Sequence, residues 1–164
     1  MSRRGVVLVA VLLILALLVI FGLVMLSKES AHFEAARRDA FSAQAFELAM
    51  AGLEDARVKL DKDYHFPRSN GSEQVLLSYS EVVYDLDEVT ELGSYRVTID
   101  QRWQNENYQV LRITSVGYAG PASQIKANRK LVVYLDTAAE LRGAPGTPNP
   151  NYFEFINFED RGSL

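Results

Sequence analysis

The chain contains no cysteine among its 164 residues. It therefore forms no disulfide, and neither a thiolate nucleophile nor a cysteine metal site is available to it. Histidine is scarce: only His32 and His65 occur, and a helix between them would separate them by about 50 Å. No G-x-S-x-G, H-E-x-x-H or glycine-rich phosphate loop is present. We expect no enzymatic activity, no catalytic residues and no cofactor.

Positive charge is less abundant than negative charge. The chain has 17 Lys and Arg against 21 Asp and Glu, a net charge of −4, and a pI near 5.2. An acidic protein does not attract a polyanion through its overall field. We therefore expect no nucleic-acid partner. The length after the N-terminal region suits one compact domain.

Charge is absent altogether from the 21 residues of segment 6–26, VVLVAVLLILALLVIFGLVML. As a helix this segment would span about 31 Å, close to the hydrocarbon thickness of a bilayer. The apolar core of a secretory signal is shorter and ends at a small-x-small site, which is missing here. Arg3 and Arg4 precede the segment and predict a cytoplasmic N-terminus. We expect a single-pass membrane helix with the following residues outside the cytoplasm.

Proline is also absent from residues 27–62, and Gly52 is the only glycine there. Alanine, the strongest helix former, is abundant instead. Apolar residues recur at spacings of three and four, which predicts one buried helix face: Phe41, Ala45, Leu48, Gly52, Ala56 and Leu60, widened by Phe46, Met50 and Leu53. We expect a single helix from about Val6 to Lys62, with an amphipathic part over residues 27–63.

In the region 64–136, after a turn-rich linker, apolar residues recur at every second position. Alternation predicts three antiparallel strands, about 94–103, 108–118 and 124–136, with a possible fourth at 81–86. Their expected inner residues are Tyr95, Val97, Ile99, Trp103, Leu111, Ile113, Ile125, Leu131, Val133 and Leu135. A sheet with one apolar face needs cover, which the amphipathic helix supplies. The predicted fold is α+β: a long N-terminal helix packed on a small antiparallel sheet.

The last segment, 137–164, has a different composition. It contains three prolines and ends in aromatic residues, which are Tyr152, Phe153, Phe155 and Phe158. The prolines exclude a central strand at their positions. We expect a Pro- and Gly-rich tail whose aromatic end either docks on its own domain or forms an exposed interaction segment.

Two further features leave alternatives open. The acidic residues Asp85, Asp87, Glu88 and Glu91 form either a solvated loop or a calcium site, although their spacing does not fit an EF-hand. Gly52 lies in a helix interior, where glycine costs about 1 kcal/mol relative to alanine. Small residues there allow another backbone to approach, either the chain's own sheet or a neighbouring subunit.

The order of these features resembles type IV pilin-like proteins of the minor pilin or minor pseudopilin kind. The likeness rests on the short basic leader ending in Gly5, the apolar run that follows at once, and the continuous helix beyond. The stretch AFELAMAGLEDARVKL (45–60) is similar to the A-x-x-A-x-A-G-L-x-x-A segment of PilX-type minor pilins. The strands SYRVTI, YQVLRITSVGYAG and NRKLVVYL are similar to the sheet half of those proteins.

The resemblance implies a structural role in a type IV pilus (fimbrium) or a type II secretion filament. Residues 1–5 would be a leader that prepilin peptidase removes between Gly5 and Val6, with methylation of the new amine. Segment 6–26 would span the bacterial inner membrane and later lie in the filament core. Partners would be the peptidase, the membrane and other pilin or pseudopilin subunits.

Two departures favour a minor subunit. Many filament-forming pilins have Glu at the fifth mature position, where this chain has Ala10, and the usual first mature residue is Phe rather than Val6. Without that carboxylate, a subunit does not need to pair with the N-terminal amine of a subunit that was assembled before it. This suits a tip or initiation position. The alternative from another class is a single-pass membrane protein whose outer domain is a binding or sensor module.

Overall fold

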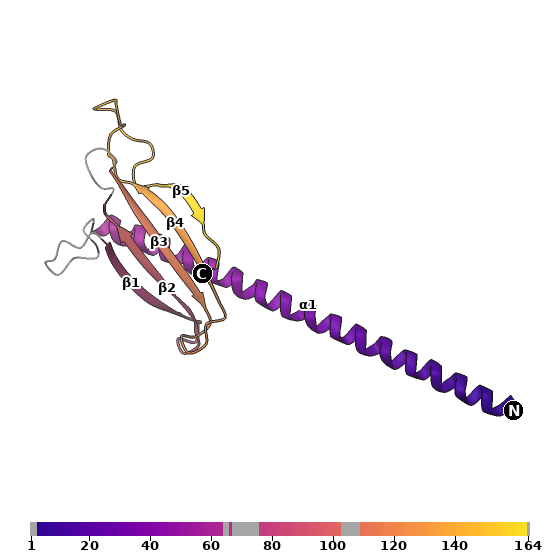
Figure 1. Cartoon of the computed structure of the whole chain (residues 1–164). Helices are drawn as coiled ribbons and strands as arrows, with labels where there is room; N and C mark the ends of the chain where they lie inside the picture. The colour runs from indigo at the N-terminus through magenta and orange to yellow at the C-terminus, as the bar shows by residue number, and fades with distance from the viewer. Residues whose placement is uncertain (1–2, 64–65, 67–75, 103–108, 164) are drawn as a thin grey trace. The chain divides into compact units, whose positions relative to one another are not determined.

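The computed structural model describes residues 3–63, 66, 76–102 and 109–163 (Figure 1). The chain divides into two compact units, residues 1–39 and 40–164. Helix α1 (Arg3–Lys62) runs through both. Trp103, His65 and most of the expected linker at 64–74 lie outside the described residues.

The first unit is the N-terminal part of α1. It has no break, and the described large apolar side chains from Val11 to Leu26 are all exposed. Lipid or another apolar helix solvates such a surface, whereas water does not. The chain therefore has a helix near its N-terminus that is long and apolar enough to cross a membrane.

The second unit contains the rest of α1 and one antiparallel sheet. Its strands are neighbours in chain order, as Figure 1 shows: β1 (Leu76–Tyr84), β2 (Glu91–Asp100), β3 (Val110–Ala119), β4 (Ala127–Asp136) and β5 (Phe155–Asp160). The α+β class is confirmed. Consecutive antiparallel strands need only short hairpin connections, so this meander follows directly from the alternation of strand and turn residues.

The core lies between α1 and one face of the sheet. From the helix it receives Ala45, Leu48, Ala49, Leu53, Ala56 and Leu60, all buried. Val97, Ile99, Leu111, Ile113, Leu131, Val133 and Leu135 face them from the sheet with no exposed surface. The predicted helix face is therefore the buried one, although Phe41 at its N-terminal end is only half-buried.

The sheet is larger than the sequence suggested. The possible strand at 81–86 is instead the nine-residue β1, which begins at Leu76, and the tail contributes β5. β5 pairs with β4, with Leu135 opposite Phe155 and Val133 opposite Phe158. Thus the aromatic end of the segment 137–164 docks on its own domain. The edge of β4 would otherwise present unpaired backbone groups, which is the physical reason for this pairing.

One inner residue was assigned incorrectly. Ile125 was expected to face the core from a strand beginning at 124, but β4 begins at Ala127 and Ile125 is half-exposed in the preceding loop. Gly120 has a φ of 89°, which L side chains rarely adopt, and its amide donates to the Leu92 carbonyl oxygen at 2.9 Å. The turn that begins at Gly120 and Pro121 therefore contains more residues than the alternation of apolar and polar residues predicted.

Candidate functional site

The residues predicted for processing and membrane orientation all lie in the first turns of α1. Arg3, Arg4, Gly5, Val6 and Ala10 are helical. The apolar segment follows them without interruption. The same stretch of helix therefore carries the basic residues, the expected cleavage point and the membrane-length segment.

The predicted packing residues form the contact between α1 and the sheet. Ala45, Leu48, Gly52, Leu53 and Ala56 are all buried. A Cβ atom on Gly52 would lie 2.5 Å from Ser115 Oγ and 2.9 Å from the Tyr95 ring. Gly52 thus allows the chain's own sheet to approach the helix, which is the first of the two alternatives for this glycine.

A polar cluster joins the last turns of α1 to β1 and β2. Lys59 Nζ lies 2.6 Å from Asp55 and also contacts Glu81, while Tyr79 and Tyr95 each donate a hydrogen bond of 2.9 Å, to Asp55 and Glu81 respectively. Burial, followed by these bonds to carboxylates, raises the pKa of both phenols. The phenols therefore stay protonated and act as donors that fix the helix on the sheet.

Lys59 is the cation at the centre of this cluster. Burial acts against its charge, but hydrogen bonds to Asp55 and Glu81 outweigh that effect and raise its pKa. Its Nζ also lies 4.4 Å from the centre of the Tyr79 ring, a cation–π distance. Asp55 and Lys59 are four residues apart on α1, a spacing at which helical side chains meet, so this pair could be found from the sequence. The partners from β1 and β2 have no signal in the sequence because the strand register brings them there.

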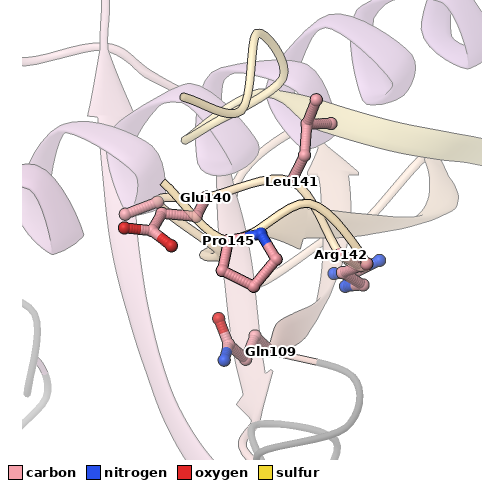
Figure 2. Close-up of a pocket in the computed structure, with 7 residues that line it drawn as sticks. Gln109, Glu140, Leu141, Arg142 and Pro145 are labelled. Carbon is pink, nitrogen blue, oxygen red and sulfur yellow. The ribbon is translucent and has the colours of Figure 1, made fainter. Parts of the chain in front are cut away.

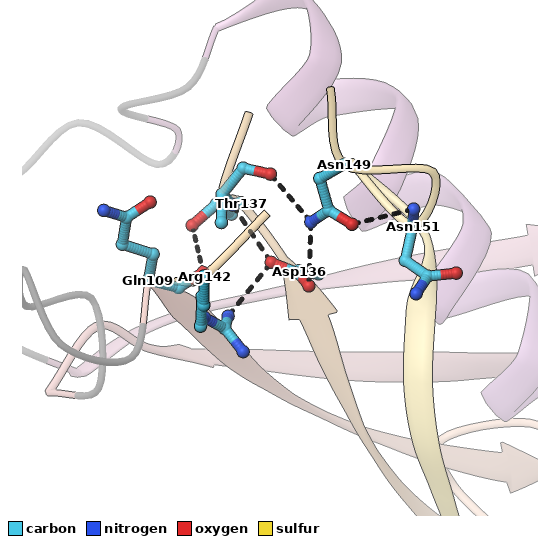
Figure 3. A network of polar contacts seen from close by, with 7 residues as sticks. Gln109, Asp136, Thr137, Arg142, Asn149 and Asn151 are labelled. Carbon is cyan, nitrogen blue, oxygen red and sulfur yellow. Dashed lines mark hydrogen bonds and ion pairs between the residues drawn. The ribbon is translucent and has the colours of Figure 1, made fainter. Parts of the chain in front are cut away.

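A second network holds the loop that follows β4 (Figure 3). Asp136 is buried, and its carboxylate accepts hydrogen bonds from Ala138 N at 3.0 Å, Arg142 Nη2 at 3.1 Å and Asn149 Nδ2 at 3.1 Å. Asn149 also donates to the Ala138 carbonyl oxygen at 2.8 Å. The Asp136 carboxylate thus binds three positions of one loop. The composition alone predicted an irregular tail there.

A depression of about 550 Å³ lies beside this network (Figure 2). It is lined by Gln109, Ala139, Glu140, Leu141, Arg142, Gly143 and Pro145. Glu140 already accepts a hydrogen bond from Gly146 N at 2.8 Å, and Arg142 is bound to Asp136. These contacts hold the Glu140 and Arg142 side chains in place at the wall of the depression. Among the described residues that line it, none is a nucleophile paired with a base.

The acidic loop between β1 and β2 uses its carboxylates internally. Asp87 accepts hydrogen bonds from Val89 N, Thr90 N and Thr90 Oγ1 at 2.6–2.9 Å. These bonds, first of all the one from the Thr90 hydroxyl, lower the pKa of Asp87. Within the described ranges, no three His, Cys, Asp or Glu side chains are arranged to hold a metal ion. The geometry around Asp85, Asp87 and Glu88 is that of an ordered acidic turn.

A smaller depression of about 290 Å³ lies at the C-terminal end of α1. Its lining residues are Arg57, Val58, Asp61 and Phe153. Arg57 is paired with Glu54 and lies 5.7 Å from the centre of the Phe155 ring.

No family model, curated protein or solved structure matches the chain.

Proposed function

We propose that the protein is a structural subunit of a pilin-type filament, a minor pilin or pseudopilin of a type IV pilus or type II secretion system. The observation that carries this proposal is the character of α1. It is exposed and apolar over residues 11–26, and without a break it becomes the helix that packs on the sheet from Ala45 onward. A simple membrane anchor needs no continuous helix that leads from the membrane into its domain, whereas a subunit whose membrane helix becomes part of a filament core does.

Two environments accept the apolar part of this helix. In the bacterial inner membrane its neighbours are lipid tails, and in a filament they are the helices of other subunits. Transfer between the two requires that few charges cross the bilayer. Removal of the leader by prepilin peptidase takes away Arg3 and Arg4, which otherwise hold the N-terminus on the cytoplasmic side.

The sheet and its loops would then form the outer part of the filament subunit. Polar contacts at both ends of the helix–sheet contact support this role. The Lys59 cluster fixes the last turns of α1, and Gln44 Nε2 donates to the Leu92 carbonyl oxygen at 3.1 Å. These contacts hold the part of α1 between Gln44 and Lys59 on the sheet.

Intact-mass measurement tests the proposal. The full chain is expressed in bacterial membranes with and without an active prepilin peptidase. We expect a loss of mass equal to MSRRG only with the peptidase, plus one methyl group where the enzyme also methylates. Gly5→Val should abolish cleavage. Gly22→Ala serves as the matched control because a Cβ atom there meets nothing within 4 Å.

The same experiment separates the alternative function. A membrane-anchored binding or sensor module would keep residues 1–5 in every cell. The observation that favours this alternative is the depression beside Arg142. If the protein is not cleaved after Gly5, the filament proposal is wrong and the binding-module alternative remains.

A further inference from the structure

Strand β1 forms the open edge of the sheet. Among the described residues it pairs with β2 alone, in an unbroken register from Leu76 to Val83, and Figure 1 shows it at the border of the sheet. The opposite edge strand, β5, is shorter, and its pairing with β4 shifts where Asn157 has a φ of 56°. A long straight edge can pair with another strand, whereas a bulge hinders such pairing.

The hydrogen bonds of the neighbouring strands fix which backbone groups of β1 point outward. The Gly120 amide donates to the Leu92 carbonyl oxygen at 2.9 Å, so Leu92 directs its backbone groups to β3. Residues of an antiparallel strand alternate between its two neighbours. The odd-numbered residues of β2 therefore bond to the odd-numbered residues of β1. It follows that Ser78, Ser80 and Val82 direct their amide and carbonyl groups away from the sheet.

The side chains at these outward positions are exposed and uncharged. Ser78 and Ser80 are both exposed, and so are the apolar side chains beside them on the same face. Leu76 is 51% exposed, Val82 45% and Tyr84 52%. Unpaired backbone groups and exposed apolar side chains thus occur along one strand. Together they are typical of a site to which an extended peptide adds.

The usual protection of an edge strand is missing from β1. Natural edge strands carry lysine, proline or uncompensated charge, which prevents pairing with other chains. β1 has no lysine or proline, and Glu81 is its only charged residue. The Glu81 carboxylate accepts a hydrogen bond of 2.9 Å from Tyr95 Oη and contacts Lys59 Nζ. Its charge is therefore compensated on the helix side and does not repel a strand at the edge.

The turn that follows β1 restricts the charge of a partner strand. Asp85, Asp87 and Glu88 lie in this turn, and residues 85–91 contain neither lysine nor arginine. A strand that runs antiparallel to β1 begins beside the turn. Basic residues at the start of the partner strand are therefore favoured.

We propose that β1 binds an extended segment of a different protein, which adds to the sheet as a further strand antiparallel to β1. The segment has apolar residues along β1 and basic residues at its N-terminal end. Main-chain hydrogen bonds to Ser78, Ser80 and Val82 supply most of the recognition, and the apolar contacts add to it. The inference goes beyond the proposed filament function and does not depend on it.

A second copy of the chain fits this edge less well. Antiparallel pairing of β1 with β1 of another copy would make the two α1 helices, each packed on its own sheet, run in opposite directions. Two copies held in one membrane by their N-terminal helices run in the same direction. The alternative, a parallel pairing of the two edges, is less stable for each residue.

A synthetic peptide tests the proposal. The probe is NRKLVVYL, the sequence of residues 128–135, with a fluorescent label at its N-terminus. It has the required character because Arg129 and Lys130 precede an apolar run. Fluorescence anisotropy measures its binding to the full chain in detergent, and protein-free micelles give the background. We expect saturable binding. No binding to the folded chain would overturn the proposal.

Ser80→Pro removes one outward amide and should weaken binding of the peptide by about tenfold or more. An edge strand tolerates proline where the N–H faces solvent. Ser80→Ala is the matched control, because it retains the amide and should bind the peptide like the unchanged chain. Near-ultraviolet circular dichroism shows whether both variants fold. Equal binding by the two variants would overturn the proposal.

Changes in the peptide test the same contact without altering the protein. Two versions are N-methylated, one at residues 131, 133 and 135 and the other at 130, 132 and 134. A strand directs every second amide to its neighbour, so one version should lose binding and the other should keep it. Equal effects of the two would overturn strand addition. The peptide with Arg129→Glu and Lys130→Glu should bind more weakly, and unchanged affinity would overturn the antiparallel direction.

The full chain carrying Ser80→Cys distinguishes a second copy from a different protein, because the chain has no cysteine of its own. After oxidation in membranes without the peptide, we expect a monomer. A disulfide-linked dimer would show that a second copy occupies the edge and would overturn the proposal.

Discussion

Gly117 on β3 lies so close to Ala45 on α1 that a Cβ atom at position 117 would come within 2.1 Å of the Ala45 carbonyl oxygen. The same atom would lie 2.5 Å from Ala49 N. Both obstacles are backbone atoms of the helix, so no side-chain rotation relieves them. Gly117 therefore sets how closely the helix lies on the sheet.

Replacing this glycine should separate the helix from the sheet. We expect Gly117→Ala to cost about 3 kcal/mol or more, since overpacking that only a backbone shift relieves lies at the high end of its usual range. Thermal unfolding of the full chain in detergent, followed by near-ultraviolet circular dichroism, measures it. Gly22→Ala, in open surroundings, should leave the melting temperature unchanged. Equal melting of the two variants would show that the close approach is not required.

Gly52 leads to a different prediction, because the atoms that a Cβ would meet there belong to side chains. Ser115 Oγ is buried and has no hydrogen-bond partner in the described part of the chain. We expect Ser115→Ala alone to be neutral or stabilising by about 1 kcal/mol, since it removes an unsatisfied hydroxyl. Gly52→Ala should destabilise, and adding Ser115→Ala should restore part of the loss. Strict additivity in this double-mutant cycle would contradict the contact.

Leu53 has no exposed surface and contacts the centre of the core. Leu53→Asp or the similar Leu48→Asp should unfold the domain, because a buried unpaired charge costs more than the stability of a small domain. Val58→Asp on the same helix is the control, since an exposed substitution changes stability by about 0.5 kcal/mol or less. Loss of near-ultraviolet signal at 25 °C is the measurement. A folded Leu53→Asp variant would show that this helix face is not in the core.

Asp136 should control the order of the following loop. We expect Asp136→Ala to lower the local stability by about 2 kcal/mol, because Arg142 and Asn149 lose a buried acceptor. Trypsin should then cleave after Arg142 roughly thirty times faster. Glu154→Ala, on the exposed part of the same loop, is the matched control. Unchanged cleavage after Arg142 would mean that other contacts hold the loop.

Acid stability should depend on Asp100. Hydrogen bonds from the Arg102 side chain lower the pKa of this carboxyl, against the opposing effect of burial. Since the folded pKa is depressed, the contribution is fully present above the unfolded pKa of about 3.9 and is lost as the pH falls through the folded pKa. Asp100→Asn and Arg102→Gln should each flatten the stability curve below pH 4 or so. If stability falls with pH in both variants as it does in the unchanged protein, the Asp100–Arg102 pair does not contribute to acid stability.

Local patterns in the sequence were sufficient for several elements. The spacing of Ala45, Leu48 and Leu53 identified the buried helix face, and alternation placed the inner residues of β2, β3 and β4. Such patterns are local because each residue's face follows from the period of its own helix or strand. The membrane-length segment and the basic residues before it need no tertiary information at all.

Contacts between distant residues were not predictable in the same way. β5 was missed because the preceding prolines suggested a tail, and Ile125 was placed in the core because the turn was judged too short. The Asp136 network and the Lys59 cluster join residues from different elements. Their chemistry is ordinary for surface residues, so no single stretch of sequence distinguishes them.

The sequence by itself determined that this chain has an apolar helix of membrane length, an amphipathic continuation and a meander of alternating strands. Only the tertiary structure decided that Gly52 faces the chain's own sheet, that the aromatic tail completes that sheet, and that the Asp136 carboxylate holds the loop after β4. Period and composition act within a few residues. Register, close backbone approach and exposure depend on which segments the whole chain brings together.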